Sequence, residues 1–296
     1  MCSLSVLIPV YNQEDFLEEA ISSVLNQSFK DFELVLINDG STDKTAKIIK
    51  SFNDSRVKMH STSNNGVVSA LNYGLRICST NIIARFDADD IMLPDRLKIQ
   101  YKFFTENNLI LVGSNALIID SNGNIVRKSN LPLKHNEINS NMLNMAPSIF
   151  HPSVMFNKKK IMEYGGYNFN AKYVEDYDLW LFLSKKGRFA NINEPLIKYR
   201  VHESGISRVK KKQAKLNGLV SLKNHVLNSR RLSKNNSIFF KKTIEDKLFF
   251  KIVFKIDSLI WAIKNDNDYF SVKNNILSIP FLLLRKFFMK FYKYFV

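Results

Sequence analysis

The stretch LSVLIPVYNQEDFLEEAISSVLNQSFKDFELVLINDG, residues 4–40, decides the fold. Leu4–Val10 is a continuous apolar run, which is typical of a strand buried on both faces. Glu14–Gln27 then carries apolar residues at helical spacing, and Phe32–Ile37 is a second apolar run that ends in turn residues. The order strand, helix, strand predicts two parallel strands joined by a crossover helix.

The same alternation continues along the chain. It predicts helices at Thr42–Phe52, Gly66–Cys78 and Pro94–Glu106, and strands at Val57–Ser61 and Asn81–Asp87. Shorter elements follow, with strands predicted at Leu109–Ile119, His151–Phe156 and Pro195–Arg200 and a helix at Glu175–Lys186. Ligands of parallel sheets bind beyond the carboxyl ends of the strands. The polar segments Pro9–Asn12, Asn38–Asp43 and Asp87–Asp90 follow strands and are therefore the candidate binding loops.

Charge is distributed unevenly along the 296 residues, whose net charge is +16. Residues 1–204 carry 23 basic and 22 acidic side chains, whereas residues 205–296 carry 20 basic and 5 acidic ones. Such asymmetry indicates a polyanionic partner, either a nucleic acid or an anionic membrane surface. A solubilising charged face is the alternative interpretation.

The cysteine content, the length of the apolar runs and the motifs that the sequence lacks exclude several classes of protein. With only Cys2 and Cys78, a disulfide scaffold or a cysteine zinc site is not expected, and a reducing, cytosolic setting is favoured. The first residues lack the pattern of a signal peptide, and the apolar run Ile276–Leu284 stops at Arg285, so we expect neither export by that route nor a membrane span. The sequence contains no GxxxxGK[ST] and no GxGxxG phosphate-binding motif.

Three acidic segments could carry chemistry. Asp87-Ala88-Asp89-Asp90 places three carboxylates together, which suits a divalent cation on a diphosphate but also an acidic helix start. Asp39 could accept hydrogen bonds from a nucleoside, or simply form a turn before glycine. Glu175-Asp176 could include a general base, or offset a helix dipole. His151 and His202 are further candidate ligands or bases, although a lone histidine is more often structural.

At this point the motifs carry a resemblance. The opening stretch VLIPVYNQ to INDGSTD, then NNGVVSALNYG, IARFDADD, HPSVMF and VEDYDLWL, resembles the family 2 inverting glycosyltransferases with a GT-A fold, of the type that builds bacterial surface polysaccharides. The resemblance covers about residues 4–205. It implies an α/β fold, with a Rossmann-like, mixed but mainly parallel sheet flanked by helices. It also implies a catalytic domain at 1–205, followed by a basic, aromatic-rich helical region at 206–296.

The resemblance also implies roles for individual residues. On this basis Asp176 would be the catalytic base, Glu175 would orient the acceptor, and Asp89 would bind the metal with His202 completing its shell. The residues implied to bind the nucleotide-sugar are Pro9, Tyr11, Asp39, Arg85, Asp87, Gly165 and Gly166. The segment at His151 would lie beside the acceptor. Mn²⁺ or Mg²⁺ is the implied cofactor, and the implied donor is a nucleotide-sugar, uridine-based on the resemblance alone.

The composition of the basic C-terminal region indicates which partners to expect. Ile244–Ile263 has apolar residues at helical spacing and is interpreted as a helix packed on the protein or on another subunit. Leu284–Val296 has an aromatic face and a lysine face, which favours docking on an anionic membrane. No nucleic-acid motif is evident. We therefore expect a cytoplasmic enzyme, peripheral at the inner face of the cell membrane, that acts on a glycan or lipid-linked acceptor.

Two alternatives stay open at this stage. One is a transferase that charges polyprenyl phosphate with a single sugar. The other is a non-catalytic, nucleic-acid-binding protein on the same fold, which the intact acidic motifs disfavour. An oligomer is compatible with either interpretation of the C-terminal region.

Overall fold

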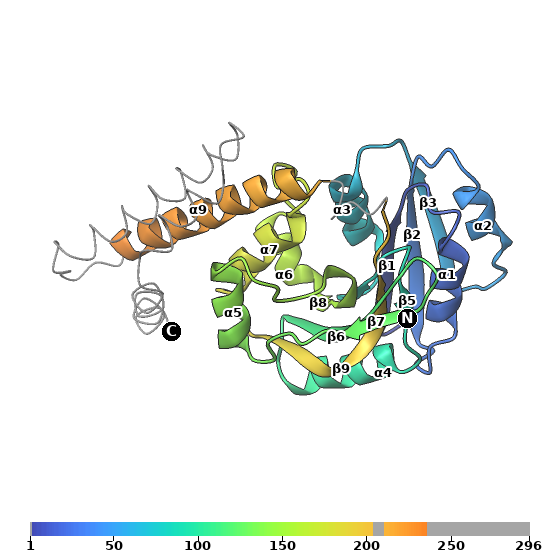
Figure 1. The fold of residues 1–296 in the computed structure, drawn as a ribbon, viewed down its shortest axis with the longest axis horizontal. Coiled ribbons are helices and arrows are strands. Elements are labelled where there is room, and N and C mark those ends of the chain that lie inside the picture. Colours follow the sequence, from blue (N-terminus) through green and yellow to red (C-terminus); the bar gives the residue numbers. More distant parts are fainter. Residues whose placement is uncertain (1, 204–209, 236–296) are drawn as a thin grey trace. The chain divides into compact units, whose positions relative to one another are not determined.

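The computed structural model describes residues 2–203 and 210–235, with side chains described as far as residue 225 (Figure 1). The strands are β1 (Leu4–Val10), β2 (Phe32–Asp39), β3 (Val57–Thr62), β4 (Ile82–Arg85), β5 (Ile91–Met92), β6 (Leu111–Ile119), β7 (Ile125–Lys128), β8 (Met155–Asn157) and β9 (Phe189–Arg200). The helices are α1 (Leu17–Leu25), α2 (Thr45–Ser51), α3 (Val67–Ile77), α4 (Arg96–Glu106), α5 (His135–Leu143), α6 (Lys158–Tyr164), α7 (Glu175–Leu183) and α9 (Lys211–Asn235).

The described strands form one sheet in the order β3-β2-β1-β4-β8-β6-β9-β5, with β7 paired to β6. Strands β3, β2, β1 and β4 are parallel to one another, as the sequence predicts. Strand β8 is antiparallel to both of its neighbours, and β9 is parallel to β6 but antiparallel to β5. The sheet is therefore mixed and mainly parallel in its first half, which confirms the predicted fold class.

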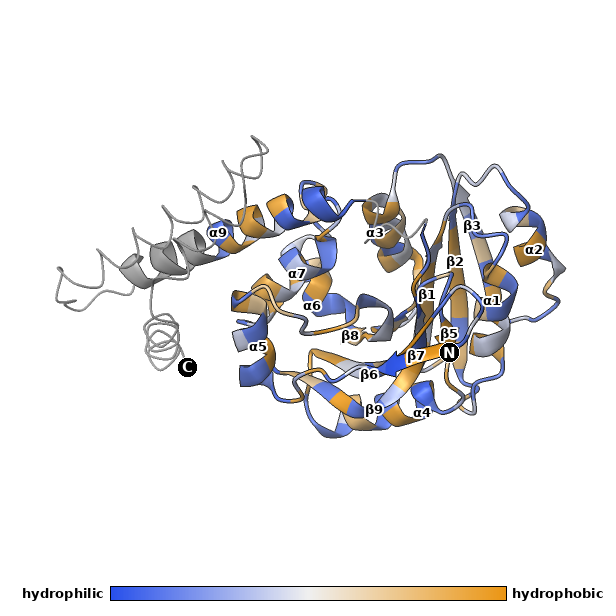
Figure 2. Cartoon of the chain, viewed as in Figure 1, coloured by the Kyte–Doolittle hydropathy of each residue, from blue (hydrophilic) through white to orange (hydrophobic). Residues whose placement is uncertain are grey.

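Helices cover both faces of the first half of the sheet (Figure 1). Alternate residues of β1 share one core cluster with the buried face of α1: Leu4, Val6, Ile8, Val10, Leu17, Ala20, Ile21 and Val24. Leu7 points the other way, and α3 approaches it so closely that a Cβ on Gly74 would lie 2.2 Å from a Leu7 methyl group. Burial on both faces explains why β1 and the middle of β2, Leu34–Ile37, are rich in hydrophobic residues (Figure 2).

The second half of the sheet departs from the predicted elements in its details. His151–Ser153 is a 3-10 turn, and the strand begins only at Met155, because Pro152 has no N–H to donate to a ladder. Strand β9 begins at Phe189, six residues before the predicted start, and its pairing with β6 shifts register near Asn115. Helix α4 begins at Arg96 rather than at Pro94. Short β5 and β7 were not predicted.

The chain divides into two compact units after Lys210. In the second unit the structure describes α9, whose 25 residues include seven lysines and arginines and no acidic residue. None of the helices in the described ranges is both long and apolar enough to cross a lipid bilayer. The helices predicted at Ile244–Ile263 and Leu284–Val296 lie outside the described residues.

Candidate active site

The carboxyl ends of β2, β1 and β4 bring the first predicted loops together. Pro9 pairs with Ile37, and Leu7 pairs with Arg85, so the three strands end at one edge of the sheet. The loop after β1 is tied to the loop after β2, because the Asn12 main-chain N–H donates to Ser41 Oγ (3.0 Å) and the Thr42 N–H donates to Asn12 Oδ1 (2.9 Å). Tyr11 is 44% exposed at this edge and is free to meet a planar ligand.

Asp39 is buried, and its carboxylate already accepts three hydrogen bonds from the protein. Thr62 Oγ1 and the Asn65 N–H donate to Oδ1 (3.0 and 3.1 Å), and the Gly66 N–H donates to Oδ2 (2.7 Å). Because Gly66 immediately precedes α3, this carboxylate caps that helix from a neighbouring strand. Asp39 thus fixes the 62–66 loop, and a nucleoside contact would use the lone pairs that remain.

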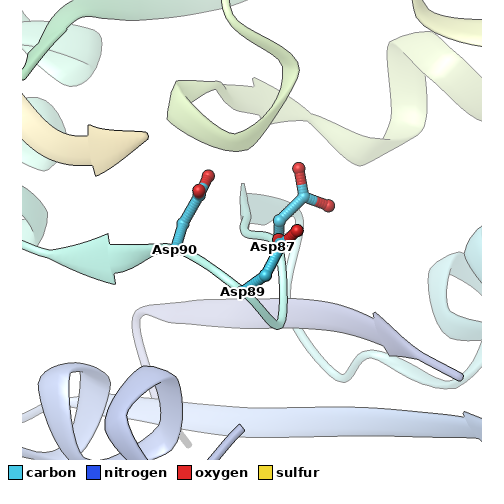
Figure 3. Close-up of side chains that lie close together, drawn as sticks. All are labelled: Asp87, Asp89 and Asp90. Atoms are coloured by element: carbon cyan, nitrogen blue, oxygen red, sulfur yellow. The ribbon is translucent and has the colours of Figure 1, made fainter. Parts of the chain in front are cut away.

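The acidic loop between β4 and β5 gathers three carboxylates. One oxygen from each of Asp87, Asp89 and Asp90 lies within 4.8 Å of the others (Figure 3). Asp90 is 1% exposed, and among the described residues its Oδ2 has no hydrogen-bond partner. Burial, together with the charges of Asp89 and Asp87, raises the pKa of Asp90 well above its usual range. Such an orphaned buried carboxylate oxygen fits a site for a cation.

His202 lies against this loop. Its Nε2 is 2.9 Å from Asp89 Oδ2, and its ring lies 5.3 Å from the ring of Phe16, centroid to centroid. The hydrogen bond to Asp89 raises the pKa of the imidazole. The two residues that the resemblance assigns to the metal are thus in direct contact, although 113 positions separate them.

Arg85 connects the acidic loop with α7. Its buried guanidinium pairs with Asp87 (2.6 Å), while Nε and Nη1 have no partner among the described residues. Burial raises the pKa of both Glu175 and Asp176, and the charge of the Arg85 guanidinium partly offsets this rise, so the three groups lie within electrostatic reach of one another. The structure therefore brings IARFDADD and VEDYDLWL to one place.

Glu175 and Asp176 sit in the first turn of α7. Burial raises the pKa of Glu175 to about 7, and the neighbouring charge of Asp176 adds to the shift. Burial also raises the pKa of Asp176, although its Oδ1 accepts the Tyr177 N–H at 2.7 Å. A carboxyl group whose pKa is raised from its usual value is suited to act as a general base. Glu175 Oε2 has no hydrogen-bond partner in the described part of the chain.

The glycine loop is held by a buried amide. Gly165 ends α6 with φ 101°, and Gly166 follows with φ 85°. Asn72 on α3 then clamps the next residue, because its Nδ2 donates to the Tyr167 carbonyl and its Oδ1 accepts the Tyr167 N–H, both at 2.8 Å. A Cβ on Gly166 would lie 2.3 Å from Asn72 Oδ1.

Gly166→Ala should therefore lower the free energy of unfolding by about 3 kcal/mol, because it combines a positive φ with the loss of the Asn72 hydrogen bonds. Gly165→Ala is the matched control, since its φ is also positive but nothing lies within 4 Å of the added Cβ. We expect it to cost only about 1 kcal/mol. Urea unfolding of the two variants measures the difference, and equal losses would show that the clamp contributes nothing.

His151 is buried in an aromatic group. Its Nε2 is 2.9 Å from Tyr167 Oη, and its ring meets that of Trp180 edge-on at 5.9 Å. Burial lowers the pKa of His151 well below its usual value, and Arg85 adds to the effect. A neutral imidazole in this place holds the Tyr167 side chain, directly after Gly166, and its contact with an acceptor stays a prediction.

Sequence reasoning missed three residues at the site: Asn72, Arg96 and Arg200. Arg96 is fully buried, donates from Nη2 to the Arg85 carbonyl (2.9 Å), and has its pKa lowered to about 9 by burial. Arg200 contacts the acidic loop directly. The only available signal for Arg200 was its place two residues before His202.

Comparison with known proteins identifies the family and the relatives that this chain resembles. Residues 5–165 match the pattern of Glycosyl transferase family 2. Among curated proteins, the O-antigen biosynthesis glycosyltransferase WbnJ of Escherichia coli is 36% identical over 213 residues, which is 69% of this chain and 82% of that protein. The amylovoran biosynthesis glycosyltransferase AmsE of Erwinia amylovora is 32% identical over 69% of this chain and 78% of its own.

Two solved structures share the fold. The S. aureus TarS structure with UDP-GlcNAc has a TM-score of 0.66 at 16% identity, covering 93% of this chain and 91% of that one. The mannosyltransferase PcManGT from Pyrobaculum calidifontis, with GDP-Man and Mn²⁺, has a TM-score of 0.57 at 16% identity, covering 99% and 82%. The chain belongs to glycosyl transferase family 2 and is a glycosyltransferase with a GT-A fold.

Proposed function

We propose that the enzyme moves a sugar from a nucleotide-sugar to an acceptor hydroxyl, with inversion at the anomeric carbon. The observation that carries the proposal is the convergence of two acidic motifs on Arg85. Asp87, Asp89 and Asp90 come from the β4–β5 loop, and Glu175 and Asp176 come from α7, yet they form one electrostatic cluster. A cation-and-diphosphate site beside a general base is the equipment that such a transfer requires.

In this proposal Asp176 accepts the proton of the acceptor hydroxyl. The acceptor oxygen forms a bond to C1 of the sugar, and the bond between C1 and the diphosphate oxygen breaks. The nucleoside diphosphate leaves with the electron pair. Glu175 is adjacent to the base, and its Oε2 has no hydrogen-bond partner among the described residues, so it is available to orient the acceptor. Gly165 and Gly166 would let the donor sugar approach the backbone closely.

A divalent cation fits the residues of the acidic loop. Asp89 and His202 would hold it, and Asp87 lies beside them next to Arg85. One oxygen of each of Asp87, Asp89 and Asp90 lies within 4.8 Å of the others, so all three carboxylates border the proposed ion. The unpartnered Oδ2 of Asp90 is a further oxygen available to it among the described residues. When bound, Mn²⁺ or Mg²⁺ would supply Lewis-acid stabilisation of the departing diphosphate.

The donor and the product are proposed by analogy. TarS was solved with UDP-GlcNAc and PcManGT with GDP-Man. We propose a uridine-based donor, held by Pro9, Tyr11 and Asp39 at the ends of β1 and β2. The relatives from E. coli and E. amylovora are named for O-antigen and amylovoran biosynthesis, which supports a role in making a bacterial surface polysaccharide. Residues 1–205 would form the catalytic domain.

A thermal-shift screen of nucleotide-sugars with Mn²⁺, followed by analysis of the product, tests this function. Stabilisation by one nucleotide-sugar and formation of a new glycosidic linkage with inverted configuration are expected. A polyprenyl-phosphate sugar as the only product would support the alternative transferase. Absence of any transfer or donor hydrolysis, across the sugars that stabilise the protein, would contradict the proposed reaction.

We further propose that the basic C-terminal region binds an anionic membrane surface at the inner face of the cell membrane. The support is the composition of α9 together with the charge of +15 carried by residues 205–296. In flotation with vesicles containing about 30% anionic lipid, the full chain should float at low salt and be released as salt rises. Failure to float, with retained binding to RNA, would favour a nucleic-acid partner instead.

A further inference from the structure

Arg200, the last residue of β9, holds the acidic loop through two hydrogen bonds. Its side chain is 3% exposed. Its main-chain N–H donates to Asp90 Oδ1 at 2.8 Å, and its Nε donates to the main-chain carbonyl of Asp89 at 2.8 Å. One residue therefore holds two consecutive aspartates of the loop, one by its carboxylate and the other by its backbone.

The two remaining nitrogens of the guanidinium also have protein partners. Nη2 pairs with Glu19 of α1 at 2.6 Å, and Nη1 donates to the Ser121 carbonyl at 3.0 Å, in the turn between β6 and β7. The planar group lies 4.6 Å from the centre of the Phe16 ring. Because every nitrogen of the guanidinium has a protein partner, Arg200 is built to hold protein groups and not a substrate phosphate.

The same arrangement also positions His202. Phe16 contacts the guanidinium of Arg200 and the imidazole of His202, so one aromatic ring packs against both. His202 lies two residues beyond Arg200, on a chain whose direction is set by the end of β9. With the Asp89 carbonyl fixed by Nε and its carboxylate facing His202, both sides of the Asp89 residue are restrained.

We propose that Arg200, braced by Glu19 and Phe16, is a positioning residue that holds Asp89, Asp90 and His202 in a preformed cation site. The inference rests on the proposed function, since it presumes that the acidic loop binds a divalent ion. Groups that orient metal ligands typically change metal affinity by about 10- to 100-fold when they are removed. Arg200 should act on cation affinity in this range.

Arg200→Lys is the informative substitution. A lysine keeps the positive charge near Glu19, and its main-chain N–H can still reach Asp90. Its ammonium carries all three N–H donors on a single nitrogen, however, and cannot span Glu19, Asp89 and Ser121 as the planar guanidinium does. Glu19→Gln is the milder variant: Glu19 is 56% exposed, so its replacement loosens the brace without opening the core. Arg127→Lys on the exposed strand β7 is the matched control.

The test measures binding of Mn²⁺ to the full-length protein by electron paramagnetic resonance of the free ion, with and without UDP. Relative to the parent protein, Arg200→Lys should raise the dissociation constant for Mn²⁺ about 10-fold or more, and Glu19→Gln should raise it by a smaller factor. Arg127→Lys should leave it unchanged. In transfer assays, kcat of the Arg200 variant should recover at saturating Mn²⁺, a split that general destabilisation would not produce.

Two outcomes would overturn the proposal in different ways. If the parent protein and both variants bind Mn²⁺ equally, Arg200 has no positioning role, and the proposed cation site stands without it. If the parent protein binds no Mn²⁺ in either condition, the cation itself is wrong, and the inference falls with that part of the proposed function. Should Arg200→Lys fold poorly, the Glu19→Gln measurement decides the first question.

Discussion

Asp176→Asn is expected to lower kcat of sugar transfer by about 10³- to 10⁴-fold while the affinity for the nucleotide-sugar stays within about threefold. Asparagine matches the size of aspartate and can still accept the Tyr177 N–H through its side-chain oxygen. It cannot take up the acceptor proton, and general-base catalysis is typically worth 10²- to 10⁴-fold. Steady-state rates with the donor identified by screening, combined with calorimetric titration of the nucleotide-sugar, measure both quantities.

Asp178→Asn is the matched control for this variant. Asp178 lies in the same first turn of α7, but its Oδ2 accepts a hydrogen bond from Asn168 at 3.2 Å. It should keep a rate within about threefold of the parent enzyme. Near-normal turnover of Asp176→Asn would refute the assignment of the base, and Glu175, whose pKa is about 7, would become the candidate.

The second large effect is expected from Asp89→Ala. It removes the carboxylate that meets His202, so donor affinity in the presence of Mn²⁺ should fall by about 100-fold, equivalent to about 2.7 kcal/mol. Donor affinity without any divalent ion should change little. Titration of the nucleotide-sugar at saturating and at zero Mn²⁺ compares the two conditions directly.

The same variant should change stability little. Burial, together with the charge of Asp89, raises the pKa of Asp87 and of Asp90, so the folded protein holds these carboxylates against mutual repulsion. Replacing Asp89 relieves that repulsion but also removes the hydrogen bond to His202, so its two effects on the free energy of unfolding oppose each other. Asp95→Ala, an exposed position five residues from Asp90, serves as the control and should not alter donor affinity. Unchanged donor affinity of Asp89→Ala with Mn²⁺ would count against the metal role.

The sequence predicted the first half of the fold well because its strands are buried on both faces. Apolar runs such as Leu4–Val10 and Phe32–Ile37 are unambiguous when helical periodicity separates them. The second half of the fold is harder to predict from the sequence, because its short strands are defined by pairing with distant segments and not by a local pattern. Ile91–Met92 is a strand because Lys198 and Ile197 lie opposite, which no local pattern reveals.

The candidate site shows the same division. Motif resemblance brought Asp89, His202 and the Glu175–Asp176 pair into one hypothesis. The structure puts His202 in contact with Asp89, and the charges of Glu175 and Asp176 act on the same group of residues. Sequence reasoning missed Asn72 and Arg200 because their hydrogen-bond partners lie 95 and 111 positions away along the chain. A buried asparagine in a helix or an arginine at a strand end carries no local signal of what it will bond to.

The position of β9 has a consequence for how the protein is made. This strand is the last of the described sheet along the chain, yet it is inserted between β6 and β5 rather than added at an edge. A growing polypeptide that has reached only residue 188 leaves β5 without its strand partner and β6 with an open side. Such unpaired edges favour association with other chains. Because β9 also carries Arg200, the acidic loop gains its hydrogen bonds to this residue only when β9 joins the sheet. We therefore expect an incompletely synthesised chain to associate with other chains and to lack catalytic activity.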